Sequence, residues 1–344
     1  GHNWFYGILG SNERQHTWMD EGMNSYMEER YTQQRYGKGG SGMLGGLGDA
    51  LKNVLPSNRG LEELVYFYEA GRGLDQSLGL RGDQFTNTNY GVLCYKKTAM
   101  NFRYLAAYLG QEEFDRIMHQ YYREWQFKHP YPKDIEMVFE RESKRNLDWF
   151  FGDLLNSAKT MDYSIQKKGQ ELVLKNKGEM ASPVPVLIQT ENGNETVQWV
   201  EGFSEGEKRL PLPSNHTGTI DPDGVTLDLN WGNNSTAKKV DLKFGLGFPK
   251  AGEKNLYFLP AIGNNANDGW LFGAVIHNGR IPASKLDFLV MPLYGNKSGK
   301  LAGHAHAYYH IRPLQKGVKD WSIGGILRQY SFQNNRIPLS FTHF

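Results

Sequence analysis

Two residues near the beginning of the chain, His2 and Glu21, have the side chains and the spacing of two ligands of one metal ion. Glu21 lies near the start of a stretch, residues 18–36, whose apolar side chains recur at helical spacing. Imidazole nitrogens and carboxylate oxygens are common zinc ligands, and a catalytic zinc ion keeps its fourth position for water. We therefore expect His2 and Glu21 to bind Zn²⁺ together, and Glu28 to orient one of these ligands from behind.

The residues around this pair resemble those of the gluzincin zinc metallopeptidases of the aminopeptidase N and leukotriene-hydrolase family. The pattern of that family is H-E-x-x-H, eighteen intervening residues and then Glu, usually as N-E-G-x-x-x-Y-x-E. Here His2 corresponds to the second histidine, and Asp20-Glu21-Gly22 is followed by Tyr26 and Glu28. Asp20 stands where Asn is common. The opening segment, residues 2–7, is particularly similar to that of envelope members from Bacteroidetes-type bacteria.

The resemblance has consequences for what this chain contains. It implies that the first histidine and the catalytic glutamate precede Gly1, so that the chain is expected to be a fragment and to be inactive alone. For the parent protein it implies zinc-dependent hydrolysis of a peptide or protein substrate, with an aminopeptidase favoured. The choice between trimming N-termini and cutting internally stays open, because the loop that binds the substrate amine in the family lies upstream of the zinc motif.

A second match to the family concerns a tyrosine. Family members carry Y-x-K-G-A at the head of a helix, and the tyrosine stabilises the oxyanion of the tetrahedral intermediate. The corresponding segment here is Tyr95-Lys96-Lys97-Thr98-Ala99, with Thr98 in place of Gly. A phenol suits this role because it donates a hydrogen bond to negative charge while it stays neutral. Tyr90 is the rival candidate, and the resemblance favours Tyr95.

An alternative hypothesis is a protein that has the peptidase fold but does not catalyse hydrolysis. A lone histidine beside aromatic residues is most often structural, and a glutamate in the first turn of a helix is usually solvated. Only the spacing between His2 and Glu21, together with Tyr95, distinguishes them from such residues. The second hypothesis is therefore a metal-free scaffold or binding protein of the cell envelope that retains the peptidase fold.

Composition excludes some classes of partner. The chain has 344 residues and a formal net charge of +2, which gives no sign of nucleic-acid binding. Its one cysteine, Cys94, excludes an internal disulfide bond. No apolar run is long enough for a membrane-spanning helix. The expected location, the bacterial cell envelope (periplasm or outer membrane), therefore follows from the resemblance alone.

The periodicity of apolar residues predicts a multidomain α+β protein. Residues 1–160 contain several amphipathic stretches, which predict a helical bundle; the resemblance makes it the C-terminal part of a thermolysin-like catalytic domain. From residue 161 the period changes to two, with Gly and Asn at the turns. Residues 161–235 are therefore expected to form a small β-sandwich with a packing role.

Residues 236–344 predict a third, antiparallel β region with longer and more aromatic strands. In residues 303–311 small residues alternate with His304, His306 and Tyr308. This alternation is typical of strands in outer-membrane β-barrels, so the region is expected to be barrel-like, truncated at Phe344 and associated with an outer membrane. A soluble β domain is the alternative. His304 and His306 could bind metal, but a sheet surface is the favoured interpretation because no third ligand is evident.

Overall fold

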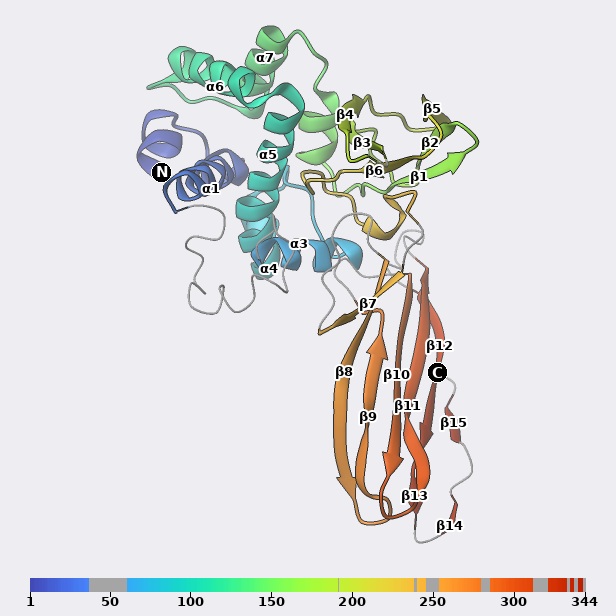
Figure 1. The fold of residues 1–344 in the computed structure, drawn as a ribbon. Coiled ribbons are helices and arrows are strands. Elements are labelled where there is room, and N and C mark those ends of the chain that lie inside the picture. Colours follow the sequence, from blue (N-terminus) through green and yellow to red (C-terminus); the bar gives the residue numbers. More distant parts are fainter. Residues whose placement is uncertain are drawn as a thin grey trace.

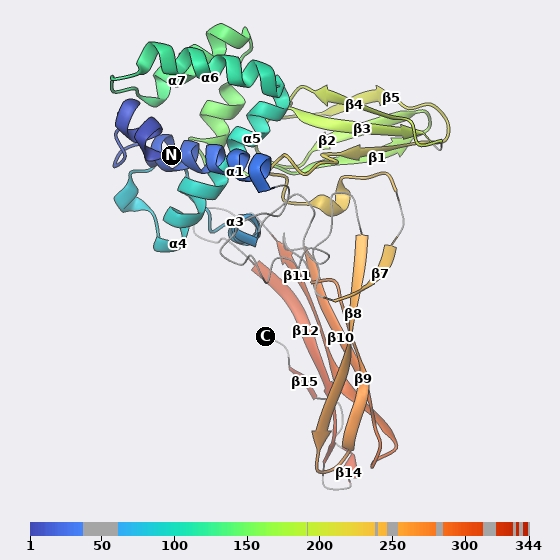
Figure 2. The same ribbon diagram turned by 60° about the vertical axis from the view of Figure 1, so that its left-hand side comes forward.

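The computed structural model describes residues 1–36, 61–190, 192–237, 240–245, 254–279, 285–311, 321–332, 335–336 and 340–342. A helical part comes first in the chain, a small pair of sheets follows, and a long sheet extends away from both (Figures 1 and 2). Mixed helical and β content in this order agrees with the fold class expected from the sequence. None of the described helices has the length and apolar character that crossing a membrane would require.

The helical part combines ordinary α-helices with short π-helical turns. Its α-helices are α1 (Met23–Tyr36), α3 (Leu61–Gly71), α4 (Asn87–Asn89), α5 (Thr98–Leu109), α6 (Gln111–Trp125) and α7 (Pro132–Ser143). Its π-helical turns are Asn3–Ile8, Trp18–Gly22, Tyr90–Lys97 and Trp149–Leu154, and a 3₁₀ turn covers Gly82–Gln84. The helix expected over residues 18–36 is thus a π-helical turn that continues into α1. Such turns are rare and often occur at functional sites.

Local sequence explains where these helices begin and end. Gly110, with φ +91°, ends α5 and precedes α6, a conformation that glycine adopts without strain. Pro132 begins α7, where its missing N–H costs no hydrogen bond, and the Asp134 carboxylate accepts a hydrogen bond from the backbone N–H of Tyr131. The fully buried ring of Phe102 on α5 then lies at the centre of the core, 5.5 Å from Phe150 and 6.2 Å from Trp18 between ring centroids.

Two three-stranded antiparallel sheets follow the helices. One has the order β1-β2-β5 and the other β4-β3-β6. Their strands are β1 (Tyr163–Lys168), β2 (Glu171–Asn176), β3 (Val184–Thr190), β4 (Glu195–Val200), β5 (Glu207–Pro211) and β6 (His216–Ile220). The sheets lie beside α5, where the buried ring of Tyr104 stacks on Trp199 of β4 with centroids 6.2 Å apart (Figure 2). One hydrophobic core therefore runs from the helices into these sheets.

The long sheet has seven strands in the order β15-β12-β11-β10-β9-β8-β7. These are β7 (Val240–Phe244), β8 (Lys254–Asn265), β9 (Gly269–His277), β10 (Leu286–Gly295), β11 (Lys300–Ile311), β12 (Trp321–Gln329) and β15 (Ser340–Thr342). Two short strands, β13 (Ser331–Phe332) and β14 (Asn335–Arg336), pair separately. All neighbours in the long sheet are antiparallel except β7 and β8.

The long sheet can be compared with the expectation of a barrel-like, truncated region. The strands that the structure describes form an open sheet, because β7 and β15 each have a neighbour on one side only. Alternation of side chains specifies that a strand has two faces, but it does not specify whether the outer strands of a sheet meet. The sequence pattern alone therefore could not predict whether the outer strands of this sheet pair with each other.

Candidate metal centre

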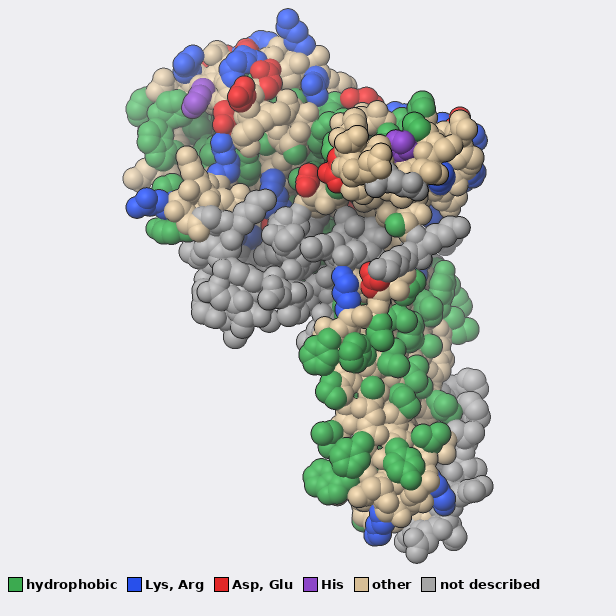
Figure 3. Space-filling view, viewed as in Figure 1, with side chains coloured by type: hydrophobic (Ala, Val, Ile, Leu, Met, Phe, Trp, Pro, Cys, Tyr) green, Lys and Arg blue, Asp and Glu red, His purple; other side chains and the backbone are tan. Residues whose placement is uncertain are grey.

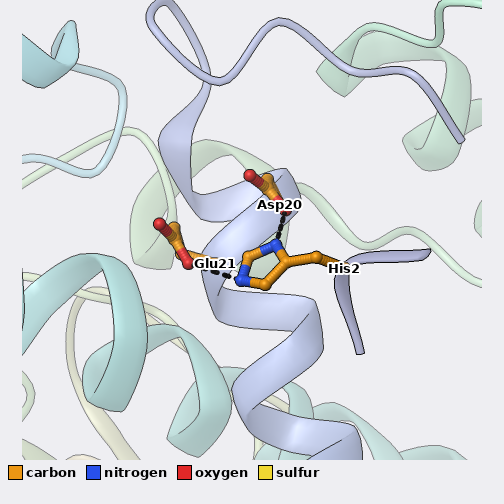
Figure 4. Close-up of side chains that lie close together, drawn as sticks. All are labelled: His2, Asp20 and Glu21. Carbon is orange, nitrogen blue, oxygen red and sulfur yellow. Dashed lines mark hydrogen bonds and ion pairs between the residues drawn. The ribbon is translucent and has the colours of Figure 1, made fainter. Parts of the chain in front are cut away.

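The structure brings His2 and Glu21 together. His2 precedes the π-helical turn Asn3–Ile8, and Glu21 lies in the π-helical turn Trp18–Gly22. Nε2 of His2 lies 3.2 Å from Oε2 of Glu21, and the imidazole ring sits between the carboxylates of Glu21 and Asp20 (Figure 4). The His2 side chain is 54% exposed, whereas that of Glu21 is 17% exposed. One side of the pair is thus accessible to solvent.

Asp20 is the third member of the cluster. Its Oδ1 lies 2.7 Å from Nδ1 of His2, and the side-chain amide of Asn24 donates a hydrogen bond of 3.3 Å to the same oxygen. The Asp20 side chain is 3% exposed. Burial raises the pKa of this carboxyl, and the hydrogen bond and charge of His2 oppose the increase. Asp20 can therefore fix the orientation of the imidazole ring from the side opposite Glu21.

The donor atoms of this cluster fit a zinc ion. Two atoms that bind one zinc ion tetrahedrally at about 2.1 Å lie roughly 3.4 Å apart. The 3.2 Å between Nε2 of His2 and Oε2 of Glu21 is close to that separation. A histidine that binds zinc through one ring nitrogen usually donates its other N–H to a carboxylate, and Asp20 occupies this position on Nδ1. The donor types and their arrangement are thus those of a zinc ligand pair with one supporting carboxylate.

The supporting residue is not the one that sequence reasoning named. Glu28 lies on α1 with an exposed side chain, and none of the described hydrogen bonds or ion pairs joins it to His2 or Glu21. Seven residues of an α-helix rise about 10 Å, which is too far for Glu28 to reach the pair. Asp20, and not Glu28, contacts the imidazole ring of His2. The only feature of the sequence that pointed to Asp20 was that Asp stands beside Glu21 where Asn is common.

Both candidate tyrosines lie near Glu21. Tyr95 lies in the π-helical turn Tyr90–Lys97, close enough to Glu21 for the two side chains to interact electrostatically. Burial and this interaction with the Glu21 carboxylate raise the pKa of Tyr95 well above the usual range of a phenol. The ring of Tyr90 lies 6.3 Å from that of Tyr95 between centroids, and burial followed by the charge of Glu21 raises its pKa. Both phenols therefore lie within the electrostatic influence of Glu21, and that of Tyr95 is affected more strongly.

Gly22 sets the separation between the two turns that carry Glu21 and Tyr95. A Cβ atom at Gly22 would lie 2.1 Å from Cγ2 of Thr98 and 2.7 Å from the carbonyl oxygen of Cys94. Real Cβ atoms essentially never approach other atoms this closely, so only glycine permits the observed packing. Thr98 is the residue that replaces the glycine of Y-x-K-G-A, and its side chain fills the space against Gly22.

Lysines on the turn of Tyr95 hold it to the rest of the helical part. Nζ of Lys97 lies 3.2 Å from Oδ2 of Asp75, and both side chains are less than 5% exposed. Nζ of Lys96 lies 3.5 Å from Oε1 of Glu29 on α1. Removing one partner of a buried ion pair strongly destabilises the folded protein, because the other charge stays buried and uncompensated. Lys97 therefore fixes the turn to Asp75.

Other potential ligands lie apart from this cluster. Among the described residues, His2, Asp20 and Glu21 form one group of three potential metal ligands, and Glu136, Glu140 and Asp148 form the other. Clusters of acidic side chains commonly occur without a metal ion, and Asp148 of the second group is exposed. His304 and His306 belong to neither group; their ring nitrogens lie 3.2 Å apart on β11.

Comparison with known proteins agrees with the expected family over the first part of the chain. Residues 1–153 match the model of the peptidase family M1 domain. A comparison with curated proteins gave no match. Among solved structures, aminopeptidase A of Legionella pneumophila in complex with aspartic acid is similar at 15% sequence identity and a TM-score of 0.43. The similarity covers 66% of this chain, which spans 25% of that aminopeptidase. The segment that contains His2, Glu21 and Tyr95 thus matches the M1 peptidase domain.

Proposed function

We propose that His2 and Glu21 are two ligands of the zinc ion of an aminopeptidase-type metallopeptidase. The observation that supports this most directly is the 3.2 Å between Nε2 of His2 and Oε2 of Glu21, with Asp20 on Nδ1. The match of residues 1–153 to the M1 peptidase domain supports the same reaction class. The substrate is a peptide or protein, and the first property to test is metal binding.

Each residue of the site has a distinct role in this proposal. Zinc, when bound, supplies a Lewis acid that polarises the scissile carbonyl and lowers the pKa of water. Asp20 accepts a hydrogen bond from Nδ1–H of His2, which selects the tautomer whose Nε2 lone pair is free to bind metal. Tyr95 stays a neutral phenol, because its pKa is raised, and donates a hydrogen bond to the oxyanion that forms from the carbonyl.

The reaction needs two groups besides these. Peptide hydrolysis by this class of site uses a third protein ligand and a glutamate general base. Within the part of the chain that the structure describes, only His2, Asp20 and Glu21 gather at the proposed zinc position. We therefore infer that these 344 residues alone do not hydrolyse peptides. Turnover of an amino-acid arylamide by this chain, abolished by a chelator, would contradict that inference.

The proposal is tested by the zinc content and arylamide turnover of a protein that contains these residues together with the third ligand and the general base. We expect about one zinc ion per chain, lost in Glu21→Gln and retained in Tyr95→Phe, while activity is lost in both. Glu28→Gln is the matched control: it removes the same charge from an exposed position on the next helix and should change neither property. A stably folded wild-type protein without zinc would instead favour the metal-free scaffold.

A further inference from the structure

The strands of the long sheet are longer than the others in this chain. β8 to β12 contain 12, 9, 10, 12 and 9 residues, whereas the strands beside α5 contain five to seven. Strands in globular proteins average five or six residues. A strand of about 9–11 residues, tilted, spans the roughly 30 Å hydrocarbon layer of a bilayer. The length of β8 to β12 is therefore typical of strands that cross a membrane.

One face of this sheet is apolar from β8 to β12. We call it the apolar face and define it by Val290 of β10 and the residues paired with it across the sheet. Val290 pairs with Ile276 of β9 and with Ala305 of β11. Ala305 in turn pairs with Leu327 of β12. Because side chains alternate, residues two apart on each strand share this face. Ile276 pairs with Phe258 of β8 on its other side. Hydrophobic side chains cover the sheet from end to end in Figure 3, with charged side chains visible only near its two ends.

The charged and histidine side chains of β9 to β12 all lie on the other face. Leu289 directly precedes Val290 on β10, so its side chain lies on the opposite face. Leu289 pairs with His306 of β11 and with His277 of β9, which therefore lie on that face too. Asp287 is two residues from Leu289, and Arg328 pairs with His304 on the same face. Neighbouring strands therefore agree in their alternation. On β9 to β12 charge is therefore confined to the face opposite the apolar face.

The apolar face is exposed, in contrast to the other face. Ile262, Leu301 and Ile323 are 61–69% exposed, whereas Leu271 and Leu293 on the other face are buried with Ala302 in a small core. Soluble proteins rarely expose contiguous apolar patches larger than a few hundred Å². Exposure of this kind in water would favour aggregation, so the apolar face needs a covering environment.

The dimensions and the ends of the apolar face identify that environment. Leu286 and Tyr294 mark its ends on β10, and the eight residue steps between them extend about 27 Å along an antiparallel strand. The apolar band of a membrane-spanning sheet is about 25 Å high, with aromatic side chains at both interfaces. Trp270 and Tyr294 lie at one end of the apolar face, and Tyr309 and Trp321 lie at the other; all four are about half exposed.

We propose that the apolar face of the long sheet contacts the hydrocarbon of a lipid bilayer. This inference goes beyond peptide hydrolysis and agrees with a location in the cell envelope. Lys297 and Lys300, at the turn between β10 and β11, then lie where they meet lipid headgroups. Sheet edges are not left unpaired in hydrocarbon, so β7 and β15 pair with further strands in the membrane-bound state.

The first test compares vesicle binding of the full chain with that of two variants. Val290→Arg places a cation at the middle of the apolar face, and Leu289→Arg places the same cation one residue away on the other face. With vesicles of phosphatidylethanolamine and phosphatidylglycerol, Val290→Arg should lower the ratio of bound to free protein roughly a hundredfold. Leu289→Arg should lower it less than about threefold. Equal effects of the two variants would overturn the proposal.

A second measurement separates lipid contact from misfolding and from a protein interface. An environment-sensitive fluorophore is attached at Val290→Cys or Leu289→Cys in a Cys94→Ala background, with vesicles that contain nitroxide-labelled acyl chains. Quenching at position 290 and not at 289 supports the proposal. Shielding of position 290 without quenching, accompanied by dimers in solution, assigns the apolar face to a second copy and overturns it. Neither measurement depends on His2 or Glu21, so its failure leaves the proposed peptidase site untouched.

Discussion

A single methyl group at Gly22 provides a sharp test of how the candidate site is held. In Gly22→Ala the new Cβ would lie 2.1 Å from Cγ2 of Thr98, far inside the roughly 3.5–4.0 Å of an ordinary carbon contact. Overpacking a buried position costs about 1–3 kcal/mol. Alanine gains up to about 1 kcal/mol over glycine in helical backbone, which offsets part of that cost. Because the Cys94 carbonyl also obstructs the methyl group, we expect the upper part of the range and a net loss of about 2 kcal/mol.

A double-mutant cycle identifies the clash as the cause. Thr98→Gly removes both Cβ and Cγ2 and should cost roughly 1 kcal/mol alone, since glycine is a poor helix former. In that background Gly22→Ala should cost at least about 1 kcal/mol less than in the wild type. Rescue stays partial, because the carbonyl oxygen of Cys94 still lies 2.7 Å from the new methyl group. Free energies of unfolding come from urea titration followed by circular dichroism of the helices.

The control for this cycle is Gly91→Ala. Gly91 lies in the same π-helical turn as Tyr95, and a Cβ atom there would meet nothing within 4 Å. This variant should therefore be neutral or more stable by up to about 1 kcal/mol. The reasoning is refuted if Gly22→Ala is as well tolerated as Gly91→Ala. It is also refuted if the losses in Gly22→Ala and Thr98→Gly add within about 0.5 kcal/mol.

Three further predictions concern single residues. Asp20→Asn should weaken zinc binding by the full-length protein about 10–100-fold in chelator competition, because the carboxylate no longer orients His2; unchanged affinity would remove Asp20 from the site. Lys97→Met should lower the free energy of unfolding by about 3–5 kcal/mol in urea, since it leaves the buried Asp75 carboxylate unpaired; a loss below about 1 kcal/mol would contradict the importance of that pair. Burial raises the pKa of the Cys94 thiol to about 12, so this thiol should react with Ellman's reagent at pH 8 only after unfolding. The pKa of Cys94 in the folded protein exceeds the value of 9.0 in the unfolded chain, so the folded state favours the protonated thiol. The stability that the protonated thiol contributes is complete below about pH 9 and is lost as the pH rises toward 12. Midpoints of urea unfolding measured over that pH range would detect this loss.

The sequence predicted that His2 and Glu21 lie together, but it did not predict the residue that contacts the other ring nitrogen of His2. Spacing alone brought His2 and Glu21 together, because the distance along the chain is a fixed property of the motif. The spacing along the chain could not predict that Asp20 contacts Nδ1 of His2. The hydrogen bond from His2 to Asp20 joins residues eighteen positions apart, and it depends on how two π-helical turns meet. Glu28 was expected in this role because it follows Glu21 by one to two helical turns and metal ligands usually need a supporting partner. Seven residues of helix, however, separate the two by about 10 Å.

In the β regions, the sequence predicted the strands and left the pairing open. Alternation with a period of two predicted that residues 303–311 form a strand with His304 and His306 on one face, and both lie within β11. It could not predict that β7 pairs in parallel with β8, since the direction of pairing depends on the path of the connecting chain. The alternation also could not distinguish an open sheet from a closed one, because both have two faces.

The continuous core described above has a consequence for cooperativity. Tyr104 on α5 is fully buried, and its ring lies 4.9 Å from Trp149 of the helical part and 6.2 Å from Trp199 of β4. The helices and the two small sheets share this core, whereas the long sheet has its own small one. Residues that share a core lose their packing together when either side opens. The two small sheets are therefore part of the same folding unit as the candidate metal centre, and a truncation before β1 would unfold His2 and Glu21 from more than 140 residues away.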